Sequence, residues 1–264
     1  MVFEIVIYYP SDYHHIRKDL YMIFTTVSQM FDHVTNQFLS KELYFYKKEN
    51  NWIGLSGSEI RSTVKDIAFG LQSLGIGKGS NVSLLSNNSP RWAMSDYGII
   101  CSGGATVSVY PTLIASQVEY ILNNSESKVV FAENQEQMQK VLESWGNCPN
   151  LQYAVVMDDS NTDSDERIFN FMDFLDVGTK HEQEVDTTFE DLVSKPQPDD
   201  LLTLIYTSGT TGDPKGVKLT HGNMMSNVEG TKQNIDFDDT ETFLSFLPLS
   251  HSFERMGGHF TAFS

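Results

Sequence analysis

The stretch that decides the fold of this chain is Ile205-Tyr206-Thr207-Ser208-Gly209-Thr210-Thr211-Gly212-Asp213-Pro214-Lys215-Gly216-Val217. Its three glycines let the backbone turn tightly and approach a ligand closely. Successive backbone N–H groups in such a loop form a nest that binds anions, and four hydroxyl side chains add donors. Lys215 supplies the only fixed positive charge. The composition predicts a phosphate-binding loop; the plainer alternative is a surface turn rich in glycine and threonine.

A strand precedes this loop, because residues Leu201–Tyr206 are mostly apolar. A strand that runs into a ligand loop is typical of the carboxyl edge of a sheet in an α/β protein. The loop differs from the G-x-x-x-x-G-K-S/T loop of common nucleotide hydrolases. The step from Gly209 to Gly212 is shorter, and a proline precedes the lysine.

Strand and helix patterns alternate upstream of the loop. Residues 43–55 predict a hairpin with its turn near Glu49–Asn51. Ser56 and Glu59 have capping-box spacing for a helix that Gly75 ends. Further strands are expected at 82–85, 105–110, 128–132 and 153–157, and helices at 90–101, 116–122 and 135–145. Such alternation with short links predicts an α/β fold, with layered, mostly parallel sheets flanked by helices.

Residues 158–200 interrupt the alternation. Fourteen of these 43 residues are Asp or Glu, against three Lys or Arg. Such a run is typical of a solvated surface excursion, so we expect it to be dispensable for folding. A short amphipathic helix near Phe169–Leu175 is the one element expected within it.

The bulk composition narrows the classes of partner. A net charge of -17 repels nucleic acid at long range, which excludes it as a partner. Cys101 and Cys148 form no metal-binding pattern, so we expect two reduced thiols in a cytoplasmic protein. The uncharged run Tyr97–Val118 is interrupted by glycine and proline, and it predicts a buried helix followed by a buried strand, not a membrane span.

The loop resembles the Thr-Ser-Gly-Thr-Thr-Gly-x-Pro-Lys-Gly signature of AMP-forming adenylating enzymes, a superfamily that includes acyl-CoA synthetases, firefly luciferase and peptide-synthetase adenylation domains. The resemblance implies that the phosphates of ATP are bound by Thr207, Ser208, Gly209, Thr210, Thr211, Gly212 and Lys215. It also makes Thr207 the candidate ligand of Mg²⁺. The stretch Thr220–Asn223 looks like a further family motif, although Thr220 and Asn223 equally suit the start of a helix.

A second segment, Leu247–Arg255, is similar to the Leu-Pro-Leu-x-His-x-Phe-Glu-Arg stretch of long-chain acyl-CoA synthetases. The resemblance implies that His251 lies near the carboxylate site and is the candidate catalytic residue. The alternative is a polar residue that caps a helix starting near Ser252. Upstream, the segments Asn88–Trp92, Gly103–Ala105 and Val109–Thr112 also look like the family's first subdomain.

The resemblance implies an N-terminal AMP-binding domain over residues 1–264. It has a first α/β subdomain at 43–157, the acidic excursion at 158–200 and the start of a second subdomain at 201–264. The family's Tyr-Gly-x-Thr-Glu and Tyr-x-Thr-Gly-Asp stretches and its C-terminal domain are absent. We therefore expect an incomplete chain that is inactive alone. We also expect the cut to expose apolar side chains, namely those of Phe246, Leu247, Phe253, Phe260 and Phe263.

The implied reaction activates a fatty acid with ATP through an acyl-adenylate and passes the acyl group to CoA, releasing AMP and pyrophosphate. One alternative is an adenylation domain that loads a carrier protein, and another is a non-catalytic nucleotide-binding fragment. Family analogy also allows a peripheral contact with a membrane. The sequence leaves acyl chain length and oligomeric state open.

Overall fold

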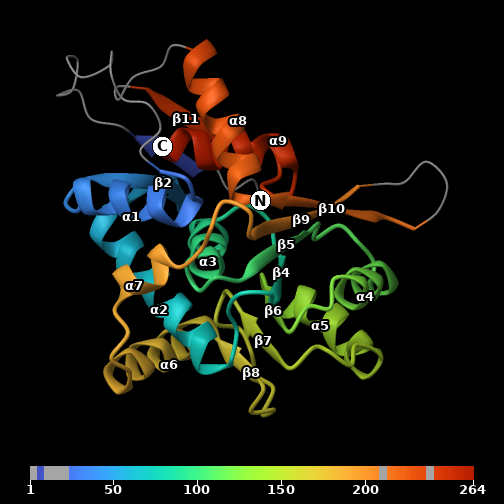
Figure 1. Ribbon diagram of the computed structural model, residues 1–264. Coiled ribbons are helices and arrows are strands. Elements are labelled where there is room, and N and C mark those ends of the chain that lie inside the picture. Colours follow the sequence, from blue (N-terminus) through green and yellow to red (C-terminus); the bar gives the residue numbers. More distant parts are fainter. Residues whose placement is uncertain (1–4, 9–23, 208–212, 236–240) are drawn as a thin grey trace.

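The structure is a computed structural model that describes residues 5–8, 24–207, 213–235 and 241–264. Its centre is a seven-stranded sheet in the order β10-β9-β5-β4-β6-β7-β8 (Figure 1). The strands are β4 (Asn81–Leu85), β5 (Ala105–Val109), β6 (Val129–Ala132), β7 (Tyr153–Val156), β8 (Ile168–Asn170), β9 (Leu201–Thr207) and β10 (Lys215–Thr220). All neighbours are parallel except β9 and β10, so the expected α/β fold with a mostly parallel sheet is confirmed.

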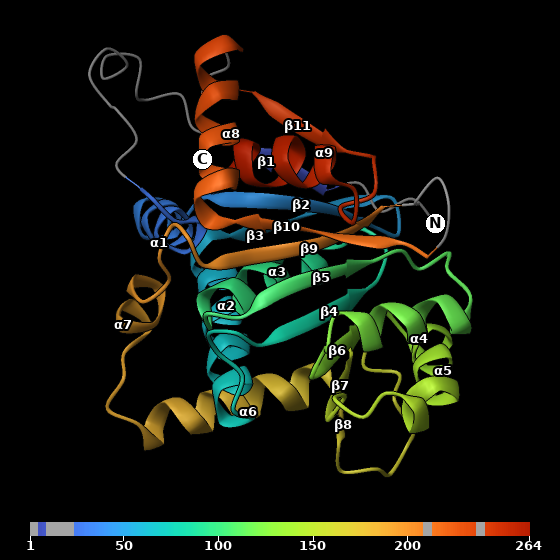
Figure 2. The ribbon, with the colours of Figure 1, turned by 45° about the vertical axis from the view of Figure 1, so that its right-hand side comes forward.

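A second, antiparallel sheet lies beside the first, in the order β11-β1-β2-β3 (Figure 2). It consists of β1 (Ile5–Tyr8), β2 (Glu42–Lys48), β3 (Asn51–Ser56) and β11 (Thr242–Ser245). The β2–β3 hairpin turns at Glu49 and Asn50, whose φ angles of 49° and 68° are both positive. Two positive φ angles give a turn whose twist matches the flanking strands, which confirms the predicted hairpin.

Helices cover both faces of the parallel sheet. One face packs on α2 (Gly57–Ser73) and α3 (Pro90–Cys101), and the other on α4 (Ala115–Asn124) and α5 (Gln135–Ser144). Alternate residues of each strand enter the two cores, as Leu84 and Leu85 of β4 do. Because both faces are covered, strands such as β5 are buried at every residue.

The sequence signals for α2 and α3 act as predicted. The Ser56 hydroxyl accepts from the Glu59 N–H, and the Glu59 carboxylate accepts from the Ser56 N–H, which completes the capping box. Gly75 ends α2 with a φ of 72°, followed by the 2.9 Å bond from the Ile76 N–H to the Leu71 carbonyl. The uncharged run Tyr97–Val118 contains the end of α3 and all of β5, both buried. No helix in the described part of the chain has both the length and the apolarity that a bilayer crossing needs.

The acidic segment differs from the expected surface excursion. It forms the edge strand β8, then α6 (Phe171–Glu184) and α7 (Phe189–Ser194). Phe174 is fully buried and packs edge-on against Phe131, with ring centroids 5.6 Å apart. The expectation of a solvated surface excursion is therefore wrong over residues 168–194, although the helix expected near Phe169–Leu175 is present as the first part of α6. That the segment is dispensable for folding stays a prediction. Asp173, Asp176 and Glu184 of α6 are exposed, while Phe171 and Phe174 are buried in the core.

Two glycines let α6 approach α2 closely. A Cβ on Gly70 would lie 2.9 Å from the Phe174 ring, and one on Gly178 would lie 1.8 Å from the Asp66 carbonyl oxygen. Larger side chains cannot occupy these positions without moving a helix. Shape at the crossing of the two helices therefore holds α6 in place.

The last residues of the chain fold back onto the core. After α8 (His221–Asn234) and β11 come α9 (Ser252–Glu254) and a π-helix, η2 (Arg255–Thr261). Phe260 and Phe263 are fully buried, and Phe263 stacks on Phe31 of α1 (Val27–Gln37) at 5.8 Å. The expectation of exposed side chains is wrong for these two residues, because α1 and α3 cover them. By contrast, Phe246 and Phe253 are 64% and 62% exposed.

Candidate functional site

The candidate phosphate loop connects β9 to β10. Thr207 ends β9, Lys215 begins β10, and the two are register partners directly across the hairpin. The predicted binding residues between them lie outside the described residues; they are Ser208, Gly209, Thr210, Thr211 and Gly212. Because β9 runs parallel to β5, the hairpin leaves the sheet at its carboxyl edge, as predicted.

Two tyrosines hold the base of this hairpin against α4. The Tyr120 hydroxyl donates to the Pro214 carbonyl at 3.1 Å, and the Tyr206 hydroxyl donates to Asn124 Oδ1 at 2.7 Å. Burial raises the pKa of Tyr206 to about 12, so this hydroxyl keeps its proton at neutral pH. The β10 strand was not predicted from sequence; it pairs with β9 along its whole length, and the two tyrosine contacts hold the residues at the loop end of this hairpin.

Thr207 and Lys215 are both exposed at this edge. Within the described ranges, Lys215 makes no ion pair. In a chain with a net charge of -17, a cation beside a glycine-rich loop is a local exception. A hydroxyl and an ammonium across one hairpin suit a phosphate group.

The His251 segment reaches the same edge of the sheet. Asn88, which follows β4, accepts from the Leu249 N–H at 2.7 Å and donates to the Leu247 carbonyl at 2.7 Å. Ser108, near the end of β5, donates to the Ser250 carbonyl at 3.2 Å. The structure thus joins two motifs far apart in sequence, the one at Asn88 and the one at 247–255.

His251 itself is exposed and serves as the N-cap of α9. Its Nδ1 accepts from the Phe253 N–H at 3.2 Å, so the capping role that sequence allowed is present. The catalytic role stays a prediction, and the placement at the carboxyl edge is compatible with it.

The Thr220 motif starts a helix, as the structural alternative predicted. Thr220 and Asn223 form a reciprocal capping box for α8. The neighbouring His221 is buried, and its Nδ1 accepts from the Val27 N–H of α1 at 3.2 Å. Burial lowers the pKa of His221 to about 4, which keeps the ring neutral and able to accept. These residues support the fold at the end of the β9–β10 hairpin opposite the loop, where Thr220 pairs with Leu201.

A polar cleft of about 440 Å³ lies at the carboxyl ends of the neighbouring strands β4, β5 and β6. Its lining residues include Asn87, Thr112, Glu133 and Lys140. Strands β5 and β6 lie on the two sides of β4. The connection from β4 to β5 runs through α3 on one face of the sheet, and the connection from β5 to β6 runs through α4 on the other face. Open α/β sheets bind ligands at such a point. The loop, the His251 segment and this cleft therefore share one edge.

A buried ion pair packed against the first halves of β5 and β9 was not expected from sequence. Arg255 of η2 and Asp96 of α3 form it, with neither side chain exposed. The one signal was a lone carboxylate in the apolar helix 90–101. The partner lies 159 positions away, which no local pattern reveals.

Comparison with known proteins identifies the family. A family model described as AMP-binding enzyme matches residues 31–264. The chain belongs to the AMP-binding enzyme family. A long-chain-fatty-acid–CoA ligase of Xenopus laevis is 29% identical over 235 residues, which cover 88% of this chain and 31% of that protein. Fatty acyl-CoA synthetase A of Dictyostelium discoideum is 32% identical over 211 residues, or 77% of this chain and 30% of that protein.

Solved structures of this class share the fold. A long-chain-fatty-acid-CoA ligase from Archaeoglobus fulgidus superposes with a TM-score of 0.70 at 20% identity, over 92% of this chain and 46% of its own. A fatty acyl-adenylate ligase from L. pneumophila gives 0.68 at 17% identity, over 92% and 38%. The chain spans about a third of the length of the curated relatives named above. The resemblance inferred from the loop is thus confirmed at the level of family and fold.

Proposed function

We propose that this protein takes part in AMP-forming activation of a fatty acid, in which ATP and the fatty acid give an acyl-adenylate that CoA then converts to acyl-CoA. One observation carries the proposal: Thr207 and Lys215 face each other at the base of a glycine-rich loop on the carboxyl edge of the sheet. The His251 segment is held at the same edge by Asn88. The relatives' names support the fatty acyl substrate.

The residues of the hairpin suit the departure of pyrophosphate. When the fatty carboxylate attacks the α-phosphorus of ATP, negative charge shifts toward the β- and γ-phosphates. We expect the Lys215 ammonium and the N–H groups of the loop to stabilise that charge, since preset donors cost no reorganisation at the moment of reaction. The Tyr120 and Tyr206 contacts keep the base of the hairpin in one place while this happens.

Mg²⁺ is proposed to be bound together with ATP. Mg²⁺ keeps several waters and takes few ligands from the protein when substrate phosphates are present. A Ser or Thr hydroxyl beside a phosphate loop can be one of these ligands, and Thr207 lies at the end of β9 where the loop begins. When bound, the ion neutralises phosphate charge and polarises the phosphoryl oxygens. Thr207 is therefore assigned to hold the ion, and Lys215 to neutralise the remaining charge.

The test measures exchange of labelled pyrophosphate into ATP by the complete gene product that contains these residues. Fatty acids from short to long chain are supplied in turn, with Mg²⁺ present. Exchange that depends on a fatty acid supports the proposal and reports its chain length. Binding of ATP without exchange for any fatty acid would instead favour a non-catalytic nucleotide-binding role.

A second measurement separates CoA from a carrier protein as the acceptor. The acyl-adenylate formed in the first assay is offered CoA or a phosphopantetheinyl carrier protein. Release of free acyl-CoA is expected, because the segment Leu247–Arg255 is similar to that of long-chain acyl-CoA synthetases. Transfer to the carrier protein alone would overturn the assignment of the acceptor and leave the adenylation step intact.

A further inference from the structure

Asp96 lies at the centre of a buried polar network. Its carboxylate accepts from the Thr106 hydroxyl at 2.6 Å and from Arg255 Nε at 3.0 Å, and a second Arg255 nitrogen completes a two-pronged contact. Asp96 and Arg255 both have no solvent exposure. Such paired contacts fix orientation as well as distance, because the guanidinium is planar.

The third arm of Arg255 reaches the strand that leads into the phosphate loop. Arg255 Nη1 donates to the Thr203 hydroxyl, which in turn donates to the Thr106 carbonyl at 2.7 Å. Thr203 lies on β9, four residues before Thr207. One side chain therefore touches α3 and β9 and, through Thr203, is linked to β5.

Arg255 is also connected directly to the His251 segment. The Arg255 N–H donates to the His251 carbonyl at 3.0 Å, so the two residues are one helical turn apart. Movement of the guanidinium would move this turn. The network thus links the strand of the phosphate loop to the segment of the candidate catalytic residue.

The residues around Arg255 and Asp96 exclude water from the pair and add no further charge to it. The guanidinium lies over the rings of Trp92 at 5.8 Å and Phe260 at 5.5 Å. His259 Nε2 lies 3.4 Å from Asp96, and burial lowers the pKa of His259, which keeps the ring neutral. One carboxylate therefore balances one guanidinium.

Burial of this pair is not explained by stability. Taking two charges out of water costs about as much free energy as their attraction returns, and apolar residues of similar volume would serve as well. A buried pair does restrict the chain to one arrangement, because any other leaves a charge without its partner. The buried pair therefore serves to hold the segments that carry Arg255 and Asp96 in one arrangement.

We propose that Arg255 is a positioning residue that fixes the His251 segment relative to β9, and so holds the two halves of the candidate site in register. The proposal rests on the proposed function, because it assigns His251 and the phosphate loop to one site. Arg255 acts through Thr203 and through its own backbone, and it touches no substrate.

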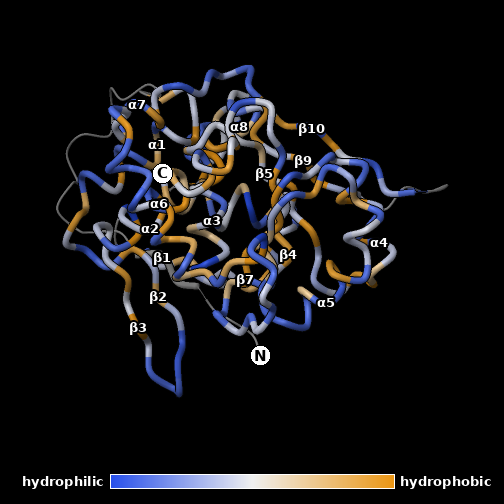
Figure 3. The backbone as a smooth tube through the Cα atoms, turned by 90° about the horizontal axis from the view of Figure 1, so that it is seen from below, coloured by the Kyte–Doolittle hydropathy of each residue, from blue (hydrophilic) through white to orange (hydrophobic). Residues whose placement is uncertain are grey.

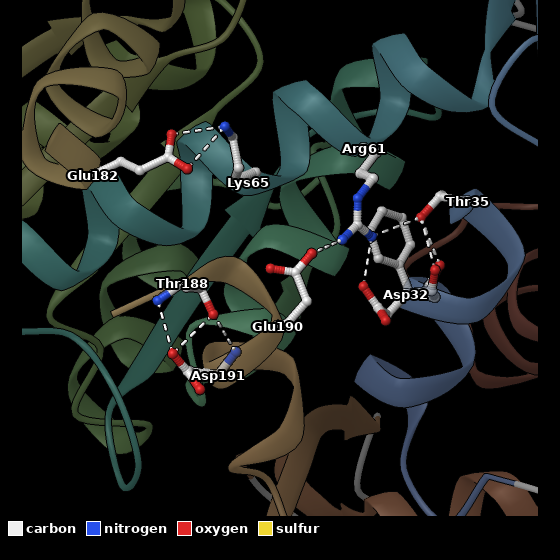
Figure 4. Close-up of polar contacts among 9 residues, drawn as sticks. Asp32, Thr35, Arg61, Lys65, Glu182, Thr188, Glu190 and Asp191 are labelled. Atoms are coloured by element: carbon white, nitrogen blue, oxygen red, sulfur yellow. Dashed lines mark hydrogen bonds and ion pairs between the residues drawn. The ribbon is translucent and has the colours of Figure 1, made fainter. Parts of the chain in front are cut away.

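The test uses variants that change the network without leaving Asp96 unpaired. Thr203→Val removes the hydroxyl at almost constant volume, and Thr203→Ser restores it. Thr35→Val is the matched control, because the Thr35 hydroxyl contacts Arg61 at 3.3 Å in a similar arginine–aspartate pair on α1 and α2 (Figure 4). All are made in the complete gene product and assayed for fatty-acid-dependent pyrophosphate exchange.

The expected result is a fall in kcat with little change in KM for ATP. We expect a loss of about 3- to 10-fold for Thr203→Val, near the effect of one misplaced group, and about 10-fold or more for Arg255→Lys, which loses the planar fork. Thr203→Ser and Thr35→Val should stay within about twofold of wild type. Equal losses in Thr203→Val and Thr35→Val would overturn the proposal.

A second readout does not depend on activity. Backbone hydrogen exchange is measured for peptides that cover residues 201–207 and 247–254. Thr203→Val should increase exchange in both segments relative to Thr203→Ser, and Thr35→Val should not. Unchanged exchange in both segments would sink the proposal even if activity fell. If the wild-type protein shows no pyrophosphate exchange with any fatty acid, the proposed function fails. The hydrogen-exchange result then still decides whether Arg255 holds the two segments in position.

Discussion

Two arginine–aspartate pairs of this protein share their chemistry and differ in burial. Arg255 and Asp96 lie inside the molecule with no exposure of either side chain. Arg61 and Asp32 lie at its rim, with side chains that are 13% and 23% exposed (Figure 4). Each arginine also contacts a threonine hydroxyl and an aromatic ring. The two pairs differ mainly in the solvent exposure of their side chains, and this difference determines the role of each pair.

The rim pair belongs to a set of contacts between α2 and the acidic segment. Arg61 binds Glu190 of α7 at 2.7 Å, and Lys65 binds Glu182 of α6 at 2.7 Å (Figure 4). Between them opens a cleft of about 440 Å³ whose lining residues run from Glu182 to Glu190 on one side. Because solvent screens these charges, each pair adds little stability and can break and reform. The inner pair has no such freedom.

The largest expected effect comes from removing one partner of the inner pair. Arg255→Met leaves Asp96 buried without a cation, which destabilises the fold by about 3–5 kcal/mol. Arg61→Met should cost about 1 kcal/mol or less, because Asp32 and Glu190 stay within reach of water. Chemical denaturation with urea measures both. Similar losses in the two variants would show that burial is not the deciding difference.

We expect the packing of apolar side chains, and not the ion pairs, to hold the acidic segment against α2. Phe174→Ala removes a fully buried ring from the crossing of α6 and α2, and we expect a loss of about 3–5 kcal/mol. Glu182→Gln, which weakens the contact with Lys65, should cost under about 1 kcal/mol. Thermal unfolding of the two variants checks the ranking. A larger loss in Glu182→Gln would reverse our view of what holds α6.

Burial also predicts a pH dependence of stability. The pKa of His221 is lowered from 6.5 to about 4 in the folded state. Below pH 6.5 the unfolded chain therefore binds a proton that the folded chain does not, so stability falls as the pH drops toward 4. The expected loss is about 2 kcal/mol between pH 7 and pH 5.

One variant isolates this group. His221→Asn keeps an acceptor near the Val27 N–H and removes the titration, so the loss between pH 7 and pH 5 should shrink. A slope that persists in His221→Asn would assign the dependence to another group.

Local signals were sufficient for most of the fold. Ser56, Glu59 and Gly75 act within a few residues of themselves, so sequence alone placed the start and end of α2. In the acidic segment the sequence predicted a short amphipathic helix near Phe169–Leu175, but the acidic residues around it concealed that its apolar face packs on the core. Phe171, Phe174 and Gly178 recur at steps of three and four, and only the approach to Gly70 explains the glycine.

The candidate site was predictable in part. The motif at Lys215 placed the loop at the carboxyl edge, but the pairing of β10 with β9 was missed. The contacts of Asn88 with Leu249 and of Arg255 with Asp96 span 161 and 159 positions, and no spacing in a single sequence reveals such partners. Tertiary pairing of polar side chains is therefore the part that the structure adds.

Removing Lys215 at the phosphate loop should affect catalysis, whereas removing Lys65 at the contact between α2 and α6 should not. Lys215→Ala removes a charged hydrogen bond to phosphate, and we expect pyrophosphate exchange to fall about 10- to 100-fold. Lys65→Ala removes a lysine of the rim and should leave exchange within about twofold. Unchanged exchange in Lys215→Ala would remove this residue from the proposed phosphate site.

The smallest effect is expected where the acidic segment does behave as a surface loop. Most residues of the stretch 162–167 are exposed, and the Asp165 carboxylate forms an ion pair with Arg167, two positions away. Replacing Thr162–Glu166 with a Gly/Ser linker of equal length keeps Asp159, which binds Arg91 at 2.6 Å. The melting temperature should shift by less than about 2 °C, because surface changes of this kind stay within about 0.5 kcal/mol. Phe174→Ala marks the scale for a change in the same segment that does reach the core. A shift of the linker variant to that scale would mean that this loop packs on the protein and that the acidic segment carries structure along its whole length.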